Sequence, residues 1–449
     1  MRKLRTGLVP VRASSLMLGV AASLVAAPIV LPAPVHAADW SVPRGQEVDD
    51  FYKVRSGRPL WFQAGQPTAA AHALLSLLTT ARADGLDPGR YKVDEIREAL
   101  KRASNGDQRA VRKADMLLSS RFAAYARDLK AFPTAGLAYA DPALRLGPPS
   151  PLRLLQMAEK APSLTQFVAD MGWMNPAYAS LRRAFISGSF ENDRQRELLR
   201  INLERARVLP ASDRYIIVNV ASQRLYMYEG TRLADTMKVV VGQDRAERKT
   251  PMMAGYLRYA SLNPYWNVPP DLVWDDVGKY VEEFGLGYLK SRGHQVLSDW
   301  GDNPSVVDPS TVDWDAVRAG TVQIRVRQLP GPQNFLGKVK YAFTNPFGVY
   351  LHDTPKKELL KEQTRLFSGG CIRLEDADRL GRWLFGKTLV AQSDEPDIEV
   401  ALDKPVPVFV TYMTAEPSGT SITYFDDVYG WDAERLAELG FGGKHVAAR

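Results

Sequence analysis

The chain has 449 residues, of which 45% are hydrophobic and 24% are charged. These ordinary values exclude a disordered tail, a collagen-like fibre and a membrane protein with several spans, and the length allows about three domains. The formal net charge of +7 falls to +3 without the four positive charges of residues 1–37, which is too weak a charge to indicate a nucleic-acid-binding protein.

The N-terminus has the order of parts of a secretory signal peptide. A basic leader precedes residues 13–38, which contain no Asp, Glu, Lys or Arg, and prolines from Pro28 onward end the apolar stretch. Small residues precede a cleavage site near Ala37, so we expect residues 1–37 to be removed on export. The alternative is an uncleaved membrane anchor, for which about 20 apolar residues without proline are needed. After cleavage we expect no stable membrane span.

Residues 38–208 are predicted to form a helical domain. Apolar residues recur at three- and four-residue spacing in segments such as 71–78 and 114–129, and we assign these stripes to a core. The period changes at 209–212, a predicted linker. Beyond it, three short segments rich in β-branched and aromatic residues predict a β-meander that opens a second domain; they are 215–220, 224–228 and 237–241.

A long insert interrupts the strand pattern of this second domain at residues 269–330. It contains helical pieces, such as 272–284, and several glycines. An insert of this length is a candidate lid, and the alternative is a packed subdomain without motion. Trp266 precedes the insert and is predicted to line a cleft beneath it, although strand aromatics are as often part of a core.

Residues 396–449 are predicted to form C-terminal strands, at 406–412 and 422–425, and a tail that packs on the preceding domains. Three acidic residues there lack the spacing of a calcium loop, and we expect them to be solvated; they are Asp426, Asp427 and Asp432.

Cys371 is the single cysteine of the chain, so no intramolecular disulfide can form. A lone thiol in an exported protein is a candidate reactive group, and the alternative is a small buried hydrophobe. Gly369 and Gly370 precede it and allow unusual backbone dihedrals, so nearby amide N–H groups could form an oxyanion hole. Arg373 is placed to hold a carboxylate or to lower the thiol pKa, and the dipole of a predicted helix over 375–385 favours the thiolate.

A thiol nucleophile needs a base, and His352 is the best-placed histidine. It ends a predicted strand and opens a loop that leads back to the Gly-Gly-Cys segment, as Cys–His catalysis requires; the alternative is a hydrogen-bonded loop histidine. His294 lies in a glycine-punctuated polar segment and is expected in a loop near a site. His72 and His445 are expected to be structural or incidental.

The chain resembles the L,D-transpeptidase family of the YkuD type, in particular its larger periplasmic members of the YcbB kind. The resemblance is carried by residues 350–355 (YLHDTP), 367–373 (FSGGCIR) and 263–270 (NPYWNVPP). It implies an α+β multidomain protein, with a helical scaffold domain at 38–208 and a mostly β catalytic domain at 213–395. The insert at 269–330 would be its capping lid, and the protein would be periplasmic.

The family resemblance also implies a reaction on peptidoglycan stem peptides. Cys371 would attack the L,D-peptide bond of a tetrapeptide stem, release D-alanine and form a thioester. The side-chain amine of a second stem's diamino acid would resolve that thioester, giving a 3–3 cross-link. His352 would be the general base and later the general acid, and Tyr350 with the N–H groups of Gly370 and Cys371 would stabilise the oxyanion. The remaining residues assigned to the oxyanion and substrate side of the site are Ser368, Arg373 and Trp266.

Two departures from the family pattern bear on this assignment. Many members carry a histidine where this chain has Gly369, which leaves His352 as the base. A helical peptidoglycan-binding module, present in longer relatives, is absent between residues 184 and 202. Three alternatives stay open: an L,D-carboxypeptidase that uses water as acceptor, an enzyme that anchors a protein amine to peptidoglycan, and a non-catalytic cell-wall scaffold. No zinc-protease, phosphate-loop or serine-hydrolase motif is present, so we expect no cofactor.

Overall fold

The computed structural model describes residues 45–131, 136–145 and 147–441. The predicted signal peptide and His445 lie outside these residues. Within them, no helix is both long enough and apolar enough to cross a bilayer.

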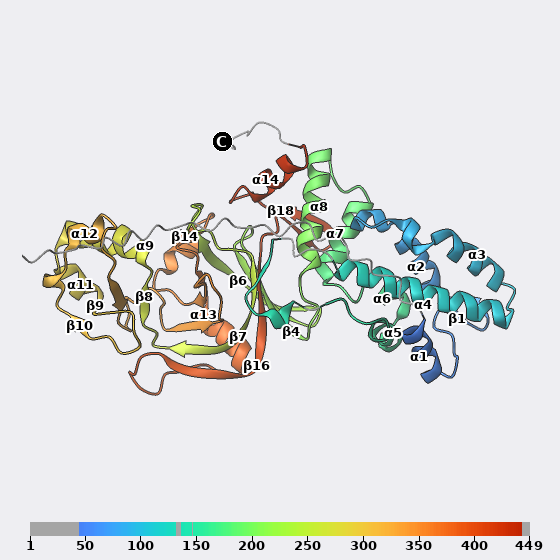
Figure 1. Cartoon of the computed structure of the whole chain (residues 1–449), viewed down its shortest axis with the longest axis horizontal. Helices are drawn as coiled ribbons and strands as arrows, with labels where there is room; N and C mark the ends of the chain where they lie inside the picture. Colours follow the sequence, from blue (N-terminus) through green and yellow to red (C-terminus); the bar gives the residue numbers. More distant parts are fainter. Residues whose placement is uncertain (1–44, 132–135, 146, 442–449) are drawn as a thin grey trace, which may run out of the picture. The chain divides into compact units, whose positions relative to one another are not determined.

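The N-terminal part of the described chain is helical, as predicted (Figure 1). Short polar residues start many of its helices: the side chains of Asp107, Ser150, Ser163, Asn175 and Asn192 each accept a backbone N–H of the first turn. The helices are α1 (Gln46–Val54), α2 (Ala69–Thr79), α3 (Val93–Ala103), α4 (Gln108–Lys130), α5 (Pro151–Lys160), α6 (Leu164–Ala169), α7 (Pro176–Ile186) and α8 (Asp193–Arg207). Between them lie the hairpin β1 (Phe62–Gln63) and β2 (Gln66–Pro67), the strand β3 (Ala138–Tyr139) and the 3₁₀ turns η1 (Ala81–Asp84), η2 (Pro88–Tyr91) and η3 (Pro142–Leu144).

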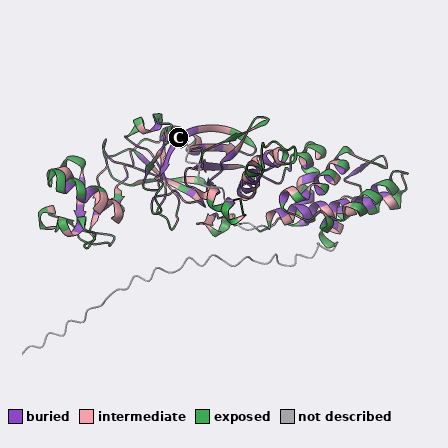
Figure 2. Cartoon of the chain, turned by 90° about the horizontal axis from the view of Figure 1, so that it is seen from above, coloured by how far each residue is buried: buried purple, intermediate pink, exposed green. Residues whose placement is uncertain are grey.

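The core of this helical part lies along α4. Its Phe122 is fully buried and meets Trp61 and Trp173 edge to face, at 5.8 and 5.0 Å between ring centroids. Burial of a side chain of this size contributes about 2 kcal/mol. In Figure 2, the helices carry buried residues on the sides that face one another and exposed residues on their outer sides.

A ring of strands forms the second part of the chain. In hydrogen-bonding order its strands are β12 (Val339–Ala342), β13 (Leu351–His352), β15 (Ile372–Leu374), β6 (Arg232–Gly242), β5 (Arg224–Glu229), β4 (Arg214–Asn219), β16 (Ile398–Thr411) and β7 (Met253–Leu262). Because β12 also pairs with β7, the sheet closes into a barrel, which leaves these strands without an open edge. The barrel carries β14 (Leu366–Ser368) on β6, the turn η6 (Lys357–Lys361) and α13 (Ala377–Phe385).

The predicted meander 215–241 is present as β4, β5 and β6, paired antiparallel in chain order. The strand β16 pairs with β4 on one side and β7 on the other. It is therefore a strand of the barrel itself. The division predicted from the sequence at residue 396 instead implied that this segment packs on the preceding domains. The chain returns to the barrel at β16, about 190 residues after β4. Pairing between strands so far apart in the chain leaves no pattern in the sequence near either strand.

The insert has a sheet and a core of its own. Its sheet has the order β10 (Val306–Val307), β9 (His294–Leu297), β11 (Arg325–Gln328) and β8 (Trp266–Val268). Its helical elements are α9 (Pro270–Leu272), the π-helix η4 (Val273–Gly278), α10 (Lys279–Phe284), α11 (Gly287–Arg292), the turn η5 (Pro309–Thr311) and α12 (Trp314–Arg318). Buried valines and Leu289 form its core, so the insert is a packed subdomain.

The C-terminal elements are β17 (Ala415–Ser418), β18 (Ser421–Tyr424) and α14 (Trp431–Glu438). Two of the three acidic residues there are not solvated, contrary to expectation. Asp432 is buried, where it pairs with Arg205 of α8 and accepts a hydrogen bond from Thr414. Asp427 accepts hydrogen bonds from the Tyr412 hydroxyl and from the N–H groups of residues 432 and 433. Partners on distant elements satisfy these carboxylates.

Candidate active site

Parallel pairing of β13 with β15 brings the segments that carry His352 and Cys371 side by side. In this register Leu351 lies opposite Ile372, and His352 lies opposite Arg373. The N–H of Ile372 donates to the Tyr350 carbonyl at 3.0 Å, which places Cys371 beside Tyr350. The Cys371 Sγ lies 3.6 Å from the carbonyl oxygen of Gly348. The loop and strand that the sequence assigns to the base and the nucleophile therefore meet.

His352 is a buried, neutral imidazole with a defined tautomer. Its Nδ1 is hydrogen-bonded to the backbone carbonyl of Asp353. A carbonyl oxygen only accepts, so Nδ1 carries the proton and Nε2 keeps its lone pair. Burial, reinforced by the Arg373 charge, lowers the pKa of His352 to about 3. The ring can therefore accept a proton at Nε2 across the physiological pH range.

The Cys371 thiol is also neutral, contrary to the expectation that Arg373 favours the thiolate. Burial raises the pKa of Cys371 to about 11. The Tyr350 backbone and the charges of Arg373 and Lys340 act to lower that pKa, but the loss of hydration outweighs them. The helix α13 begins six residues later and is capped by the Asp376 side chain, so its N-terminus faces a carboxylate of its own.

Ser368 and Gly370 fix the shape of the loop before the thiol. The Ser368 hydroxyl accepts the Gly370 N–H at 3.1 Å and donates to the Cys371 carbonyl at 2.6 Å. The Gly370 N–H is thus already bound, so its predicted role as an oxyanion donor does not hold in this structure. Among the described residues, no acceptor is found for the Cys371 N–H. That N–H remains a donor for a ligand.

A second loop, which the sequence analysis missed, supports the first from behind. The Thr250 hydroxyl donates to the Gly370 carbonyl at 2.8 Å, and the Gln243 N–H donates to the Ser368 carbonyl at 3.0 Å. Gly370 has a φ of 117°, a value that glycine adopts readily and other residues rarely do. At Gly242, a Cβ would lie 1.9 Å from the Arg248 carbonyl oxygen, so only glycine fits. In the sequence, Gly242 and Thr250 flank the charged segment 243–249, and this pattern could have indicated a loop beside the site.

Positive charge borders the thiol without a carboxylate partner. The Arg373 guanidinium has a buried Nε that no described residue accepts from, and its pKa is lowered by burial. Lys340, paired across the strands with His352, lies 5.5 Å from the Tyr350 ring centroid. Lys356 lies 4.9 Å from the Phe335 ring centroid, and burial and the Arg373 charge lower its pKa. Among the described residues, none of the three forms an ion pair with Asp or Glu. Their arrangement fits an anionic ligand.

Trp266 and His294 belong to the insert. Trp266, on β8, stacks on Phe335 at 4.6 Å between ring centroids. His294 is not a loop residue, as the sequence suggested, but a buried strand residue between Tyr288 and Trp266. Neither ring nitrogen has a hydrogen-bond partner among the residues that the structure describes, and burial lowers the pKa of His294 to about 4. It is separate from the Cys371–His352 pair.

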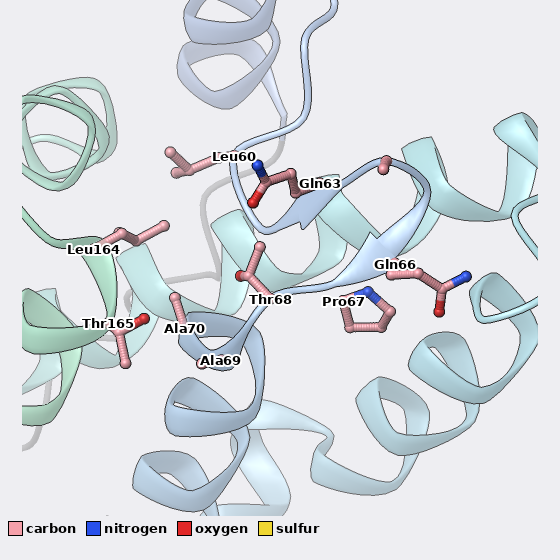
Figure 3. A pocket seen from close by; sticks show the side chains of 10 residues that line it. Leu60, Gln63, Gln66, Pro67, Thr68, Ala69, Ala70, Leu164 and Thr165 are labelled. Atoms are coloured by element: carbon pink, nitrogen blue, oxygen red, sulfur yellow. The ribbon is translucent and has the colours of Figure 1, made fainter.

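A cavity of about 640 Å³ opens elsewhere, in the helical part (Figure 3). The hairpin β1–β2, the start of α2 and the start of α6 line it with uncharged residues, among them Gln63, Thr68 and Thr165. None of the residues discussed above contributes to it. In the part of the chain that the structure describes, no group of three or more His, Cys, Asp or Glu side chains could hold a metal ion.

Comparison with known proteins assigns two regions of the chain to families. Residues 46–185 match the model of the Scaffold domain, and residues 213–408 match that of the L,D-transpeptidase catalytic domain, YkuD. A relative from Haemophilus influenzae named "Putative L,D-transpeptidase" is 30% identical over 291 residues, which cover 62% of this chain and 57% of the relative. The chain thus spans little more than half the length of that relative.

A solved structure titled "Structure of the Ldtfm-avibactam carbamoyl enzyme" is also similar to part of the chain. The match has 14% identity and a TM-score of 0.21, and it covers 45% of this chain and 49% of that one. A likeness this weak adds nothing to the argument. The two family matches are sufficient, and they agree with the predicted helical domain followed by a mostly β domain: the chain carries a YkuD-family L,D-transpeptidase catalytic domain behind a Scaffold domain.

Proposed function

We propose that this protein is a peptidoglycan L,D-transpeptidase that forms 3–3 cross-links through a thioester on Cys371. The observation that carries the proposal is the strand pairing that brings the segment of the chain's one cysteine beside that of a histidine whose Nε2 is unprotonated, within the residues that match the YkuD catalytic domain. The donor is a tetrapeptide stem, and the acceptor is the side-chain amine of a second stem. We propose that the reaction takes place in the periplasm, after removal of residues 1–37.

Acylation starts from the neutral pair. As the Cys371 Sγ attacks the carbonyl carbon between stem residues three and four, His352 Nε2 takes the thiol proton. The imidazolium then gives that proton to the departing D-alanine nitrogen, and the thioester remains. In the second half, Nε2 takes a proton from the acceptor amine as it attacks the thioester. Collapse of that intermediate returns the proton to Sγ and leaves an amide cross-link.

Two groups are available for the oxyanion of each tetrahedral intermediate. One is the Cys371 N–H, and the other is the Tyr350 hydroxyl, whose pKa is raised by burial and by Cys371, so that it stays protonated as a donor. Gly370 contributes through its conformation, and Ser368 contributes by holding that conformation.

Arg373 is proposed to bind a carboxylate of the stem peptide. Its support is the Arg373 Nε, which is buried and has no hydrogen-bond partner among the described residues. A buried cation without a counter-ion is costly, so the site is suited to an anionic peptide that supplies one. Trp266 is proposed to line the substrate cleft from the insert, where its ring stacks on Phe335. No cofactor enters these steps.

The test is mass analysis of peptidoglycan fragments after incubation of sacculi with the purified protein. We expect 3–3 cross-linked dimers from the wild type and none from Cys371→Ala, Cys371→Ser or His352→Ala. A carbapenem should add its mass to Cys371 alone. Shortened stems without dimers would indicate the carboxypeptidase, a protein-linked stem would indicate the anchoring enzyme, and activity retained in Cys371→Ala would refute the mechanism.

A further inference from the structure

The loop between β6 and β7, residues 243–249, lies between the insert and the segment that precedes Cys371. Its first residue, Gln243, bonds to Ser368, and Thr250, which follows it, bonds to Gly370. Thr250 is itself held by the Tyr429 hydroxyl, which donates to the Gly242 carbonyl at 2.7 Å and accepts the Thr250 N–H at 3.1 Å. Both ends of the loop are therefore fixed to the nucleophile segment.

Arg248 projects from this loop to the insert. Its Nη2 donates to Asp275 of the π-helix η4 at 2.7 Å, and its Nε lies 3.8 Å from an oxygen of Asp271 on α9. Its Nη1 donates to Gln243 at 3.3 Å, within its own loop. The Arg248 side chain is only 10% exposed, against 44% for Asp275. A π-helix is rare and is frequently found at functional sites.

The backbone of Arg248 contacts the nucleophile segment at the same time. Its carbonyl oxygen lies against Gly242, and it would lie 3.8 Å from a Cβ built on Gly370. The insert also lies close to the segment, because Leu272 Cδ1 would be 3.5 Å from a Cβ built on Gly369. One residue thus holds the insert through its side chain and the Gly370 region through its main chain.

We infer that Arg248 is a positioning residue that couples the insert to the loop bearing Cys371. With the Arg248–Asp275 pair formed, the insert is held over Gly369, and the Gly370 peptide is held in the conformation that aims the Cys371 N–H. When the pair breaks, the insert is released and the thiol becomes accessible to larger molecules. A half-exposed ion pair contributes little free energy, so it can break when a polymeric substrate has to enter.

The lone cysteine allows a test that needs no peptidoglycan. Rates of Cys371 alkylation are measured with iodoacetamide and with a bulky maleimide, for the wild type, Arg248→Gln and Asp275→Asn. We expect both variants to raise the maleimide rate relative to the iodoacetamide rate by about fivefold, the upper range for a partly exposed pair. The double variant should equal Arg248→Gln alone, because that change already removes the contact with Asp275.

Arg318→Gln is the matched control. Among the described residues, the partners of Arg318 lie within the insert: it pairs with Glu282 at 3.5 Å and donates to the Trp274 carbonyl at 3.3 Å. The Arg318→Gln variant should leave the ratio of the maleimide rate to the iodoacetamide rate at the wild-type value. Arg248→Lys should give a ratio between those of the wild type and Arg248→Gln, because lysine keeps the positive charge but lacks the several N–H donors of the guanidinium. Asp275→Asn keeps the test informative if Arg248→Gln does not fold, since it leaves the loop intact.

A second readout rests on the proposed function. With a donor tetrapeptide, Arg248→Gln should raise KM and lower kcat, and the Arg318→Gln variant should do neither. An unchanged alkylation ratio in Arg248→Gln and Asp275→Asn, or additive effects in the double variant, would overturn the coupling. Absence of cross-linking in the wild type would instead refute the proposed function, and the alkylation ratio would still decide the role of Arg248.

Discussion

At the scale of single residues, the two groups proposed to react are uncharged because the fold removes water from both. His352 is 3% exposed, and Cys371 is intermediate in exposure, with its Sγ 3.6 Å from the Gly348 carbonyl oxygen. Removing water penalises the charged form of each group, which lowers one pKa and raises the other. The charge needed for attack therefore arises only as substrate enters and the proton moves between the two side chains.

The pH dependence of acylation should reflect this neutral pair. With a pKa of about 3 for His352 and about 11 for Cys371, the acylation rate should be flat from about pH 5 to 9. The two values belong to the coupled pair, so the limbs of the profile are assigned to the pair. A histidine with the ordinary imidazole pKa would instead give a limb near pH 6.5. Stopped-flow acylation by a carbapenem checks this, and a limb near pH 6.5 that His352→Ala removes would contradict the neutral pair.

Gly369 and Gly370 should respond differently to the same substitution. Gly370→Ala places an alanine at a φ of 117°, which strains the backbone. We expect the acylation rate to fall at least tenfold, because an increase of about 1.4 kcal/mol in the activation free energy is enough for that. Gly369→Ala is the control, because its Cβ would make an ordinary 3.5 Å contact with Leu272. Acylation rates and melting temperatures are compared. Equal rates for Gly370→Ala and the wild type would show that this backbone conformation does not matter.

At the scale of elements, the insert contains a group that opposes its own stability in acid. His294 is buried in β9 with neither ring nitrogen bonded, and its pKa is lowered from the ordinary value near 6.5 to about 4. The unfolded chain therefore binds more protons than the folded chain in this interval. Stability is fully present above about pH 6.5 and is lost as the pH falls toward 4.

Replacing His294 by Phe should remove this acid sensitivity. The variant keeps a ring between Tyr288 and Trp266, and it has no nitrogen to protonate. The pKa difference corresponds to about 3 kcal/mol, so the variant should gain up to that amount over the wild type at pH 4 and little at pH 7.5. Urea unfolding at the two pH values measures it. His352 also destabilises the fold in acid, but it does so equally in the wild type and in the variant, so the difference in unfolding free energy between them isolates His294. Equal losses of unfolding free energy in the two proteins on acidification would contradict the assignment.

At the scale of the whole molecule, the core of the helical part extends onto strands of the barrel, which also has a core of its own. Buried residues of the helices form a single cluster with Tyr215, Ile217, Ala254 and Phe409 of the barrel strands. β3 adds to β7 in parallel, and the Arg205–Asp432 pair and the Asn202–Thr414 hydrogen bond join α8 to the C-terminal elements. The two family regions therefore pack against each other through apolar, strand and ion-pair contacts.

Residues 213–441 expressed alone should be unstable. Separation from the helices would expose an apolar face of the barrel and leave the buried carboxylate of Asp432 without Arg205, and such faces promote association. We expect aggregation, or a melting temperature at least 10 °C below that of residues 38–449, since several kcal/mol are lost. Size-exclusion chromatography and calorimetry test this. A monomeric fragment with an unchanged melting temperature would show that the barrel is an independent domain.

Several features of this protein were determined by residue types and their local spacing. The helical stripe of 114–129 and the alternation of 215–228 predicted α4 and the first strands, because each pattern fits one period only. One cysteine after two glycines and one histidine at a strand end indicated the pair that is proposed to react, because few side chains can supply that chemistry.

Tertiary structure decided the rest, through contacts between residues far apart in the chain. Closure of the barrel by β12 on β7, the Arg205–Asp432 pair across 227 positions and the contact of Arg248 with the insert leave no local pattern. The charge states of Cys371 and His352 depend on how much water the fold removes, and the oxyanion donor depends on whether Ser368 has already taken the Gly370 N–H. Hydration and hydrogen-bond competition are properties of the assembled site, so a sequence names the reacting groups but not their protonation.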